Sequence, residues 1–490
     1  MAINILTGQR YKTFASYIRC MFLKKQIIGG LMIYTVIRVF SYFFSPSTPL
    51  YAANPINWII SAGILATAVY FLLKKDIRGW YIIAAEMILG GAGNFLEIKN
   101  ISLRTLLMFF SLGIFLYHAI KQKQYKQLFA AHKKNIYILF FLLLTVSVSA
   151  VRGFYTHHAP SLIFADTIPY LFFFYYFPLS QLLQSEAFKR TTLYMIFSAI
   201  IGNALFIYTT LIGFSAKLFV LQDNYYHWFR DVASGKITEY GFNFYRIVLN
   251  EHLLLIPLLV FLISKIIVNK KNNEQIIALA ATGSLLATLA VNLTRIYILA
   301  FGVGLLFLFS KTNWKRWLAI STASVFTFIL IFTATHLAAS RGKNLGWEFF
   351  GLRLQSIAAP QTEESSLSRM LLLPKIVDKI KNHPVLGNGL GDTVTVYSPV
   401  FKQNIITPHF DWGYLEIWAE MGLFGLLAWF ILTGLIMRQI WPNLAFGAPL
   451  ATLLVINLTS PALFHVMGVL LIAILLANKP SSDHPLNPVY

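Results

Sequence analysis

Long apolar stretches, separated by short polar segments, occupy most of this chain. Many of these stretches approach the ~20 residues that a helix needs to cross the ~30 Å hydrocarbon layer of a membrane. The pattern predicts about fourteen spans, at residues 27–44, 56–73, 79–96, 103–120, 135–151, 161–183, 191–213, 248–268, 275–293, 295–310, 317–335, 412–436, 442–458 and 462–478. We therefore expect an all-α fold, a polytopic membrane helix bundle.

Composition supports this class. Of the 490 residues, 57% are hydrophobic and only 12% are charged, whereas about 25% of the residues in a soluble domain are charged. The single cysteine, Cys20, excludes an intrachain disulfide and a thiolate metal site. The first 26 residues are polar and basic and precede no small-residue cleavage site, so we expect no cleaved signal peptide.

The net charge of +21 follows the predicted topology. Lysine and arginine gather in alternate short loops, at residues 74–78, 121–134, 189–190, 265–271 and 311–316. The opposite loops 45–55 and 459–461 carry no basic residue. The positive-inside rule places the basic side, and both termini, in the cytoplasm. These charges meet anionic membrane lipids, and because no basic–aromatic stripe is present we expect no nucleic-acid partner.

Two segments on the outer face, about 214–246 and 336–411, are longer than ordinary connections, and such loops usually have a function. In the second, Ser366 is a candidate N-cap for an amphipathic helix, kinked at Pro374, that we expect to lie along the membrane surface with Arg369 over the bundle. The predicted organisation is spans with a cytoplasmic N-terminus (1–335), a large periplasmic loop with catalytic elements and short helices (336–411), C-terminal spans (412–478) and a cytoplasmic tail (479–490).

Several ionisable residues within or beside the spans need partners. Arg38 lies inside the first span, and we expect it to reach a carboxylate such as Glu86 or Glu97. At the outer end of the eighth span, Arg246 and the segment 250–252 (Asn-Glu-His) are consistent with either a buried polar network or a contact to an acceptor.

Three residues stand out as candidates for chemistry. Arg295 opens an apolar span at its outer end; either it snorkels to the head groups or it is functional. Arg369 lies in the segment SLSRMLLLPKIVDKIKNHPVLGNGLGD, and the forked donors of arginine suit phosphate. His409 begins HFDWGYLEIWAEMGLFGLL just before an apolar helix, and an imidazole can accept a proton near neutral pH.

The glycines of GNGLGD allow two interpretations. They offer backbone N–H groups to an anion, or they form a tight turn that ends the amphipathic helix. We favour the turn, because no strand–helix unit surrounds them as a nucleotide fingerprint requires.

Over residues 275–435 the order of these motifs resembles the bacterial O-antigen ligase/polymerase superfamily. Thr-Arg at 294–295 is similar to the family's Ser-Arg-Gly stretch, with Ile296 in place of glycine, and the Ser-x-x-Arg and His-Pro-x-x-Gly elements follow. The helix after His409 resembles the family ending, although Phe410 stands where asparagine is common. The matching positions are Tyr414, Leu415, Glu420, Gly422, Leu423 and Gly425.

The resemblance implies a bundle of the GT-C glycosyltransferase class in the bacterial inner membrane, with its active site facing the periplasm. Such an enzyme moves an undecaprenyl-diphosphate-linked glycan onto a lipid or glycan acceptor. By the same resemblance His409 is the general base, and Arg295 and Arg369 bind the diphosphate. Arg353, Arg341 and Arg246 are further candidate substrate contacts. Direct attack inverts the anomeric centre. The sequence contains no recognisable metal cluster, so we expect a metal-independent enzyme without a cofactor.

Two alternatives remain at this stage. A polymerase of the same superfamily moves the growing glycan onto the next lipid-linked repeat. A polysaccharide transporter or flippase typically has internal repeats and charges within its spans. We find no convincing repeat, and the polar candidates gather in one outer loop, which favours an enzyme.

Overall fold

The computed structural model describes residues 25–45, 55–99, 101–123, 125–218, 223–268, 273–359, 364–398, 402–441 and 443–478. Within these ranges the protein is an all-α, polytopic membrane helix bundle, as predicted. The predicted cytoplasmic tail 479–490 and Cys20 lie outside the described residues.

Among the described residues, ten helical runs are long and apolar enough to cross a membrane. Several combine adjacent elements: α6 (Pro160–Leu171), η1 (Phe172–Tyr175) and α7 (Tyr176–Leu182) form one run, and η3 (Asn250–Leu254) leads into α10 (Leu255–Val268). The others are the helix Lys25–Phe44, α2 (Pro55–Leu73), α4 (Leu103–Lys121), α5 (Tyr125–Tyr155), α8 (Glu186–Ser215), α11 (Asn273–Asn292), α13 (Trp314–Ala339, preceded by η4, Lys311–Asn313) and α16 (Gly413–Ile440).

The remaining four of the fourteen predicted spans are shorter helices. They are α3 (Arg78–Leu89), α12 (Arg295–Phe307), α17 (Leu444–Ile456) and α18 (Val466–Ala477). With 12 or 13 residues each and a rise of about 1.5 Å per residue, they extend only about 20 Å. The sequence overestimated their length, because a helix buried in protein is as apolar as one in lipid.

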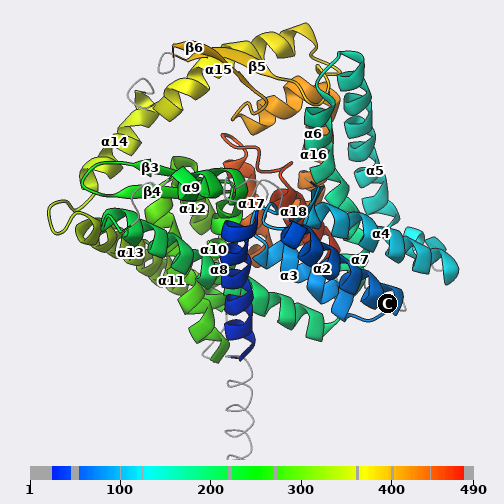
Figure 1. Ribbon diagram of the computed structural model, residues 1–490, viewed down its shortest axis with the longest axis horizontal. Coiled ribbons are helices and arrows are strands. Elements are labelled where there is room, and N and C mark those ends of the chain that lie inside the picture. Colours follow the sequence, from blue (N-terminus) through cyan, green and yellow to red (C-terminus); the bar gives the residue numbers. More distant parts are fainter. Residues whose placement is uncertain are drawn as a thin grey trace, which may run out of the picture.

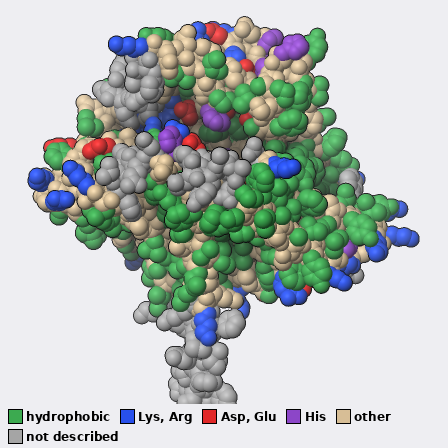
Figure 2. All heavy atoms as spheres, in the orientation of Figure 1, with side chains coloured by type: hydrophobic (Ala, Val, Ile, Leu, Met, Phe, Trp, Pro, Cys, Tyr) green, Lys and Arg blue, Asp and Glu red, His purple; other side chains and the backbone are tan. Residues whose placement is uncertain are grey.

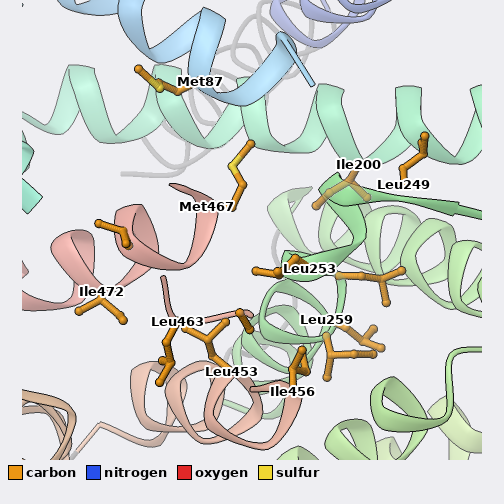
Figure 3. Packing of buried hydrophobic residues seen from close by; sticks show 14 of the residues in the cluster. Met87, Ile200, Leu249, Leu253, Leu259, Leu453, Ile456, Leu463, Met467 and Ile472 are labelled. Carbon is orange, nitrogen blue, oxygen red and sulfur yellow. The ribbon is translucent and has the colours of Figure 1, made fainter. Parts of the chain in front are cut away.

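These short helices pack closely on their neighbours, and α3 contacts α2 and α8. α12 and α10 both pack on α17, and α18 packs on α7 and η1. Figure 3 shows buried hydrophobic side chains from this region meeting across several elements: Met87, Ile200, Leu249, Leu253, Leu259, Leu453, Ile456, Leu463, Met467 and Ile472.

The two long outer segments contain secondary structure, including hairpins that the sequence did not predict. The first segment holds α9 (Asp223–His227), a π-helical turn η2 (Trp228–Val232) and the antiparallel strands β3 (Gly235–Glu239) and β4 (Tyr245–Leu249). The second holds α14 (Trp347–Ala358), α15 (Glu364–Asn382) and the antiparallel strands β5 (Val394–Ser398) and β6 (Gln403–Thr407). A minimal pair, β1 (Glu97–Ile98) and β2 (Ile101–Ser102), precedes α4.

The predicted amphipathic helix is α15, which begins two residues before Ser366 and continues through Pro374. Its residues Leu372, Ile376 and Ile380 are buried in a small core of their own. Val394 of β5, Phe410 and Ala419 of α16 complete this core. These three residues therefore pack on protein, and the position of the helix along the membrane surface stays a prediction.

In Figure 1, α14, α15 and the β5–β6 hairpin form an arc above the rest of the bundle, bounded at one end by α5 and α6 and at the other by α13. Figure 2 shows a hollow on this face between the arc and the bundle below it. Basic, acidic and histidine side chains gather there, while hydrophobic side chains cover much of the lower part. The fold thus concentrates its polar chemistry beneath the arc.

Candidate functional site

His409 lies between the end of β6 and the start of α16, and its side chain is exposed. A local turn holds its backbone: the Thr407 hydroxyl accepts from the His409 N–H at 3.2 Å and donates to the His409 carbonyl at 3.1 Å. The next residue, Phe410, is fully buried in the small core beneath α15. Phe410, at the position where the family commonly has asparagine, thus anchors the loop that carries His409.

Two carboxylates, Glu416 and Asp166, lie beneath the loop that carries His409. Glu416, one turn into α16, accepts the Phe410 N–H at 3.3 Å and is buried. Asp166 of α6 is half-buried and accepts the Gly391 N–H at 2.9 Å. It interacts electrostatically with His409 and His158, and it contacts Glu420.

Sequence reasoning missed Asp166 as a functional candidate. It precedes His409 by more than 200 positions and lies in an apolar span, so no local motif connects the two. Glu420 was recognised as a motif position but was given no chemical role. The only signal available was that a carboxylate inside a predicted span is uncommon and often functional.

Arg369 of α15 lies beside the same loop. Its Nε is 3.7 Å from Asp411 Oδ2, and its carbonyl oxygen accepts from Trp412 Nε1 at 3.1 Å. Asp411 takes a left-handed backbone conformation, with φ of 57°. The structure therefore brings Arg369, Asp411 and His409 together at the entrance to α16.

The glycine motif after α15 is a turn, as we favoured. Gly387, Gly389 and Gly391 all have positive φ, between 70° and 100°. Their N–H groups donate to protein acceptors: the His383 carbonyl at 3.0 Å, the Glu420 carbonyl at 3.0 Å and the Asp166 carboxylate at 2.9 Å. Because these donors are already used, the alternative of an anion site on them is wrong. The turn instead ties α15 to α16 and α6.

A second group of candidates lies at the start of α12. The Arg246 side chain, on β4, donates to the Asn292 carbonyl at 2.7 Å and to the Thr294 hydroxyl at 2.8 Å. Arg295, the first residue of α12, donates to Ser356 of α14 at 2.6 Å. These contacts bring Arg246 and Arg295 to the same end of α12.

Arg353 and Arg341 occupy different environments. Arg353 of α14 is buried, donates to the Tyr240 hydroxyl and lies 4.9 Å from the centre of that ring. Arg341 is exposed in the turn that follows α13, with φ of 54°.

The outer end of the eighth predicted span forms a buried polar network. Arg38 pairs with Glu251 at 2.6 Å. The two carboxylates expected for Arg38 are therefore not its partner, and Glu86 instead pairs with Arg104 at 3.0 Å. No group of three or more potential ligands within the described ranges has the arrangement of a metal site.

The ten apolar runs of the described residues support a multi-pass membrane protein, and a polar, histidine-containing site lies on its loop-rich face beneath the arc. Residues 277–430 match the family model described as O-antigen ligase. No curated protein matches the chain.

The family match supports the superfamily that the motifs predicted. The similarity of residues 277–430 to O-antigen ligase supports a ligase- or polymerase-type function in the membrane. Arg295, Arg341, Arg353, Arg369 and His409 all lie inside the matched region, whereas Asp166 and Arg246 are contributed from outside it.

Proposed function

We propose that this protein is a membrane glycosyltransferase that moves a glycan from undecaprenyl diphosphate onto a lipid or glycan acceptor, as an O-antigen ligase does, on the periplasmic side of the inner membrane. The observation that carries the proposal is the constellation at the entrance to α16. The exposed His409 lies two residues before Asp411, which pairs with Arg369, and it interacts electrostatically with the carboxylate of Asp166. Both His409 and Arg369 lie in the region that matches O-antigen ligase.

In this mechanism the acceptor hydroxyl attacks the anomeric carbon of the sugar. The bond from that carbon to the diphosphate oxygen breaks, and undecaprenyl diphosphate leaves with the bonding electron pair. His409 takes the hydroxyl proton, and Asp166 stabilises the resulting imidazolium. Direct displacement inverts the anomeric centre, and NMR analysis of the new linkage tests this; retention would require a different mechanism.

Arg369 and Arg295 stabilise the leaving diphosphate. Negative charge accumulates on the diphosphate oxygens as the glycosidic bond breaks, and fixed guanidinium groups offset it where it develops. Arg369 is held by Asp411 at only 3.7 Å, with both side chains partly exposed, so a diphosphate can replace that carboxylate. Arg246 and Arg353 orient neighbouring groups around the start of α12 and α14, and Arg341 is a candidate contact at the rim.

The test is the glycan profile of a strain that lacks the gene, separated by size and by carrier lipid and complemented with wild-type protein or His409→Gln. A ligase predicts long glycan on undecaprenyl diphosphate and a bare acceptor. A polymerase predicts single repeats only. His409→Gln should restore about a hundredfold less transfer than wild type, since general base catalysis contributes roughly 10²–10⁴-fold. An unchanged profile in the deletion strain would count against glycan transfer and would leave a transporter or another substrate.

We expect the reaction to need no metal ion. Transfer by the purified, full-length protein should be the same in EDTA as in Mg²⁺, because the proposed charge stabilisation comes from arginines. Loss of transfer in EDTA with recovery on adding back Mg²⁺ would contradict this.

A further inference from the structure

A continuous chain of side-chain hydrogen bonds runs through the interior from the first described helix to α12. Arg38 donates to Glu251 at 2.6 Å, and Asn203 donates to the other oxygen of Glu251 at 3.0 Å. His252 lies at the centre, with its Nε2 3.3 Å from Asn203 Oδ1 and its Nδ1 2.5 Å from Asn292 Nδ2. His252 is 1% exposed and Asn292 is fully buried, so water does not compete for these bonds.

The donors and acceptors determine the tautomer of His252. Its Nδ1 faces two N–H donors, the Asn292 amide and the Leu249 backbone N–H at 3.3 Å. That nitrogen must therefore carry a lone pair. The ring proton then lies on Nε2 and is donated to Asn203, whose own amide N–H₂ donates onward to Glu251. Every bond in the chain has a consistent direction only with a neutral His252 protonated at Nε2.

The far end of the chain holds the start of α12. The Asn292 side-chain oxygen accepts from both the backbone N–H and the hydroxyl of Thr294, the N-cap residue of α12. Because the Thr294 hydroxyl donates to Asn292, its lone pairs face outward and accept Arg246. The orientation of Asn292, set by His252, therefore determines how the chain turns into Arg295.

We propose that His252 is a positioning residue for the donor site. Its Nδ1 lone pair fixes Asn292, and through Thr294 this sets the positions of Arg246 and of Arg295. This role rests on the proposed function, because it matters only if these arginines meet the lipid diphosphate. A purely apolar side chain at 252 would fill the same space but would leave the N–H₂ of Asn292 without this acceptor.

Two substitutions distinguish the hydrogen bond of Nδ1 from that of Nε2, because each keeps only one of them. His252→Asn can place its carbonyl oxygen where Nδ1 lies and so still accept from Asn292, but it no longer reaches Asn203. His252→Gln can place its N–H₂ where Nε2 lies and so still donate to Asn203, but it lacks the acceptor near Asn292. If the Nδ1 lone pair is what matters, asparagine preserves the role and glutamine does not.

Two measurements on the full-length protein in detergent test this. Hydrogen exchange at the Thr294, Tyr297 and Ile298 amides reports on the start of α12, where all three donate to local acceptors. Binding of undecaprenyl diphosphate reports on the arginines. We expect His252→Gln to exchange faster at these amides and to bind at least about tenfold more weakly, since small misplacements of binding groups are costly. We expect His252→Asn to stay within about threefold of wild type in binding.

The matched control is His132→Gln. His132 also belongs to a partly buried hydrogen-bond network. Its Nδ1 lies 2.7 Å from the Tyr176 hydroxyl, and that hydroxyl accepts from the Asn135 amide at 2.9 Å. That network joins α5 and α7 on the predicted cytoplasmic side, so this variant should match wild type in both measurements.

The remaining outcomes overturn the proposal in distinguishable ways. Faster exchange in His252→Gln with unchanged binding would make the network structural only. Equal losses in the Asn and Gln variants would exclude the Nδ1 acceptor as the decisive feature. If wild-type protein binds no undecaprenyl diphosphate, the proposed donor is wrong and the positioning role falls with it. The exchange data would even then decide whether His252 holds α12.

Discussion

At the scale of single residues, the site combines an exposed histidine with half-buried and buried carboxylates. His409 faces outward at the end of β6, while Asp166, Glu416 and Glu420 lie behind it. A histidine that accepts a proton becomes cationic, and a nearby fixed carboxylate stabilises that cation more strongly away from bulk water. In the proposed mechanism, an ionised Asp166 near His409 therefore favours proton transfer to that histidine.

This arrangement predicts the effect of Asp166→Asn. Asparagine can still accept the Gly391 N–H, so the local geometry is retained while the charge is lost. We expect the rate of glycan transfer to fall by about tenfold or more, a part of the roughly 10²–10⁴-fold that general base catalysis contributes. Initial rates on membranes with equal protein levels measure this. The control Glu186→Gln removes a carboxylate that is 78% exposed and should leave the rate unchanged. A wild-type rate for Asp166→Asn would exclude its electrostatic role.

The Arg104–Glu86 pair gives a residue-scale prediction for stability. Both side chains are less than 10% exposed, and Arg104 also donates to the Gly91 carbonyl at 2.8 Å. Removing one partner leaves a buried charge uncompensated, at a cost of about 3–5 kcal/mol. Arg104→Met alone should therefore lower the melting temperature in detergent more than the double variant Arg104→Met/Glu86→Gln does. Additive effects of the two substitutions would contradict this coupling.

At the scale of elements, α16 is bent at Gly422, next to the glycine turn that follows α15. Gly422 interrupts the helix with φ of 68° and ψ of −170°. A Cβ atom there would collide with the Val385 carbonyl oxygen and would lie 2.6 Å from the Gly387 nitrogen. The bend thus lets the glycine turn after α15 pack directly on α16. This contact holds the arc, and with it Arg369, above the helix that follows His409.

Gly422→Ala should consequently disturb both folding and the site. The left-handed conformation costs a non-glycine residue about 1–3 kcal/mol, and the collision adds to that. We expect a lower melting temperature and less folded protein after solubilisation. Gly434→Ala is the matched control on the same helix, because a Cβ there meets nothing within 4 Å. If the two alanine variants behave alike, the close contact at Gly422 is not important.

The sequence predicted most elements in this region but not their packing. Periodic apolar residues revealed α15, and the glycine spacing revealed the turn after it, since both signals are local. The β5–β6 hairpin was missed because its strands are short and mostly exposed. The burial of Ile376 against Phe410 was missed because an apolar helix face looks the same whether it meets lipid or protein.

At the scale of the whole molecule, the described residues form ten long helical runs with shorter helices packed among them, and an arc of outer elements covers a polar hollow. The distribution of basic residues predicts that the hollow faces away from the cytoplasm. Lys189 lies on the predicted cytoplasmic side, whereas Lys402 lies at the exposed tip of the β5–β6 hairpin, on the opposite side.

Single-cysteine labelling tests this orientation. In a Cys20→Ser background, Lys402→Cys should react with a membrane-impermeant maleimide in intact cells. Lys189→Cys should react only after the inner membrane is permeabilised. Lys402 is exposed and the Lys189 side chain is 41% exposed, so the reagent can reach both positions and a difference in rate reports on sidedness. The reverse pattern would invert the topology and would remove the periplasmic assignment of His409.

The sequence alone determined the membrane class, the superfamily and the candidates His409, Arg295 and Arg369, because hydropathy and short motifs are properties of neighbouring residues. Only the tertiary structure decided that Asp166 lies near His409, that Arg38 pairs with Glu251 and that His252 is linked to the start of α12. The partners in the last two contacts are 213 and 40 residues apart. Such contacts depend on how the helices pack. The apolar pattern of a helix does not show which neighbouring helix its polar residues will contact, so these pairs could not be predicted from the sequence.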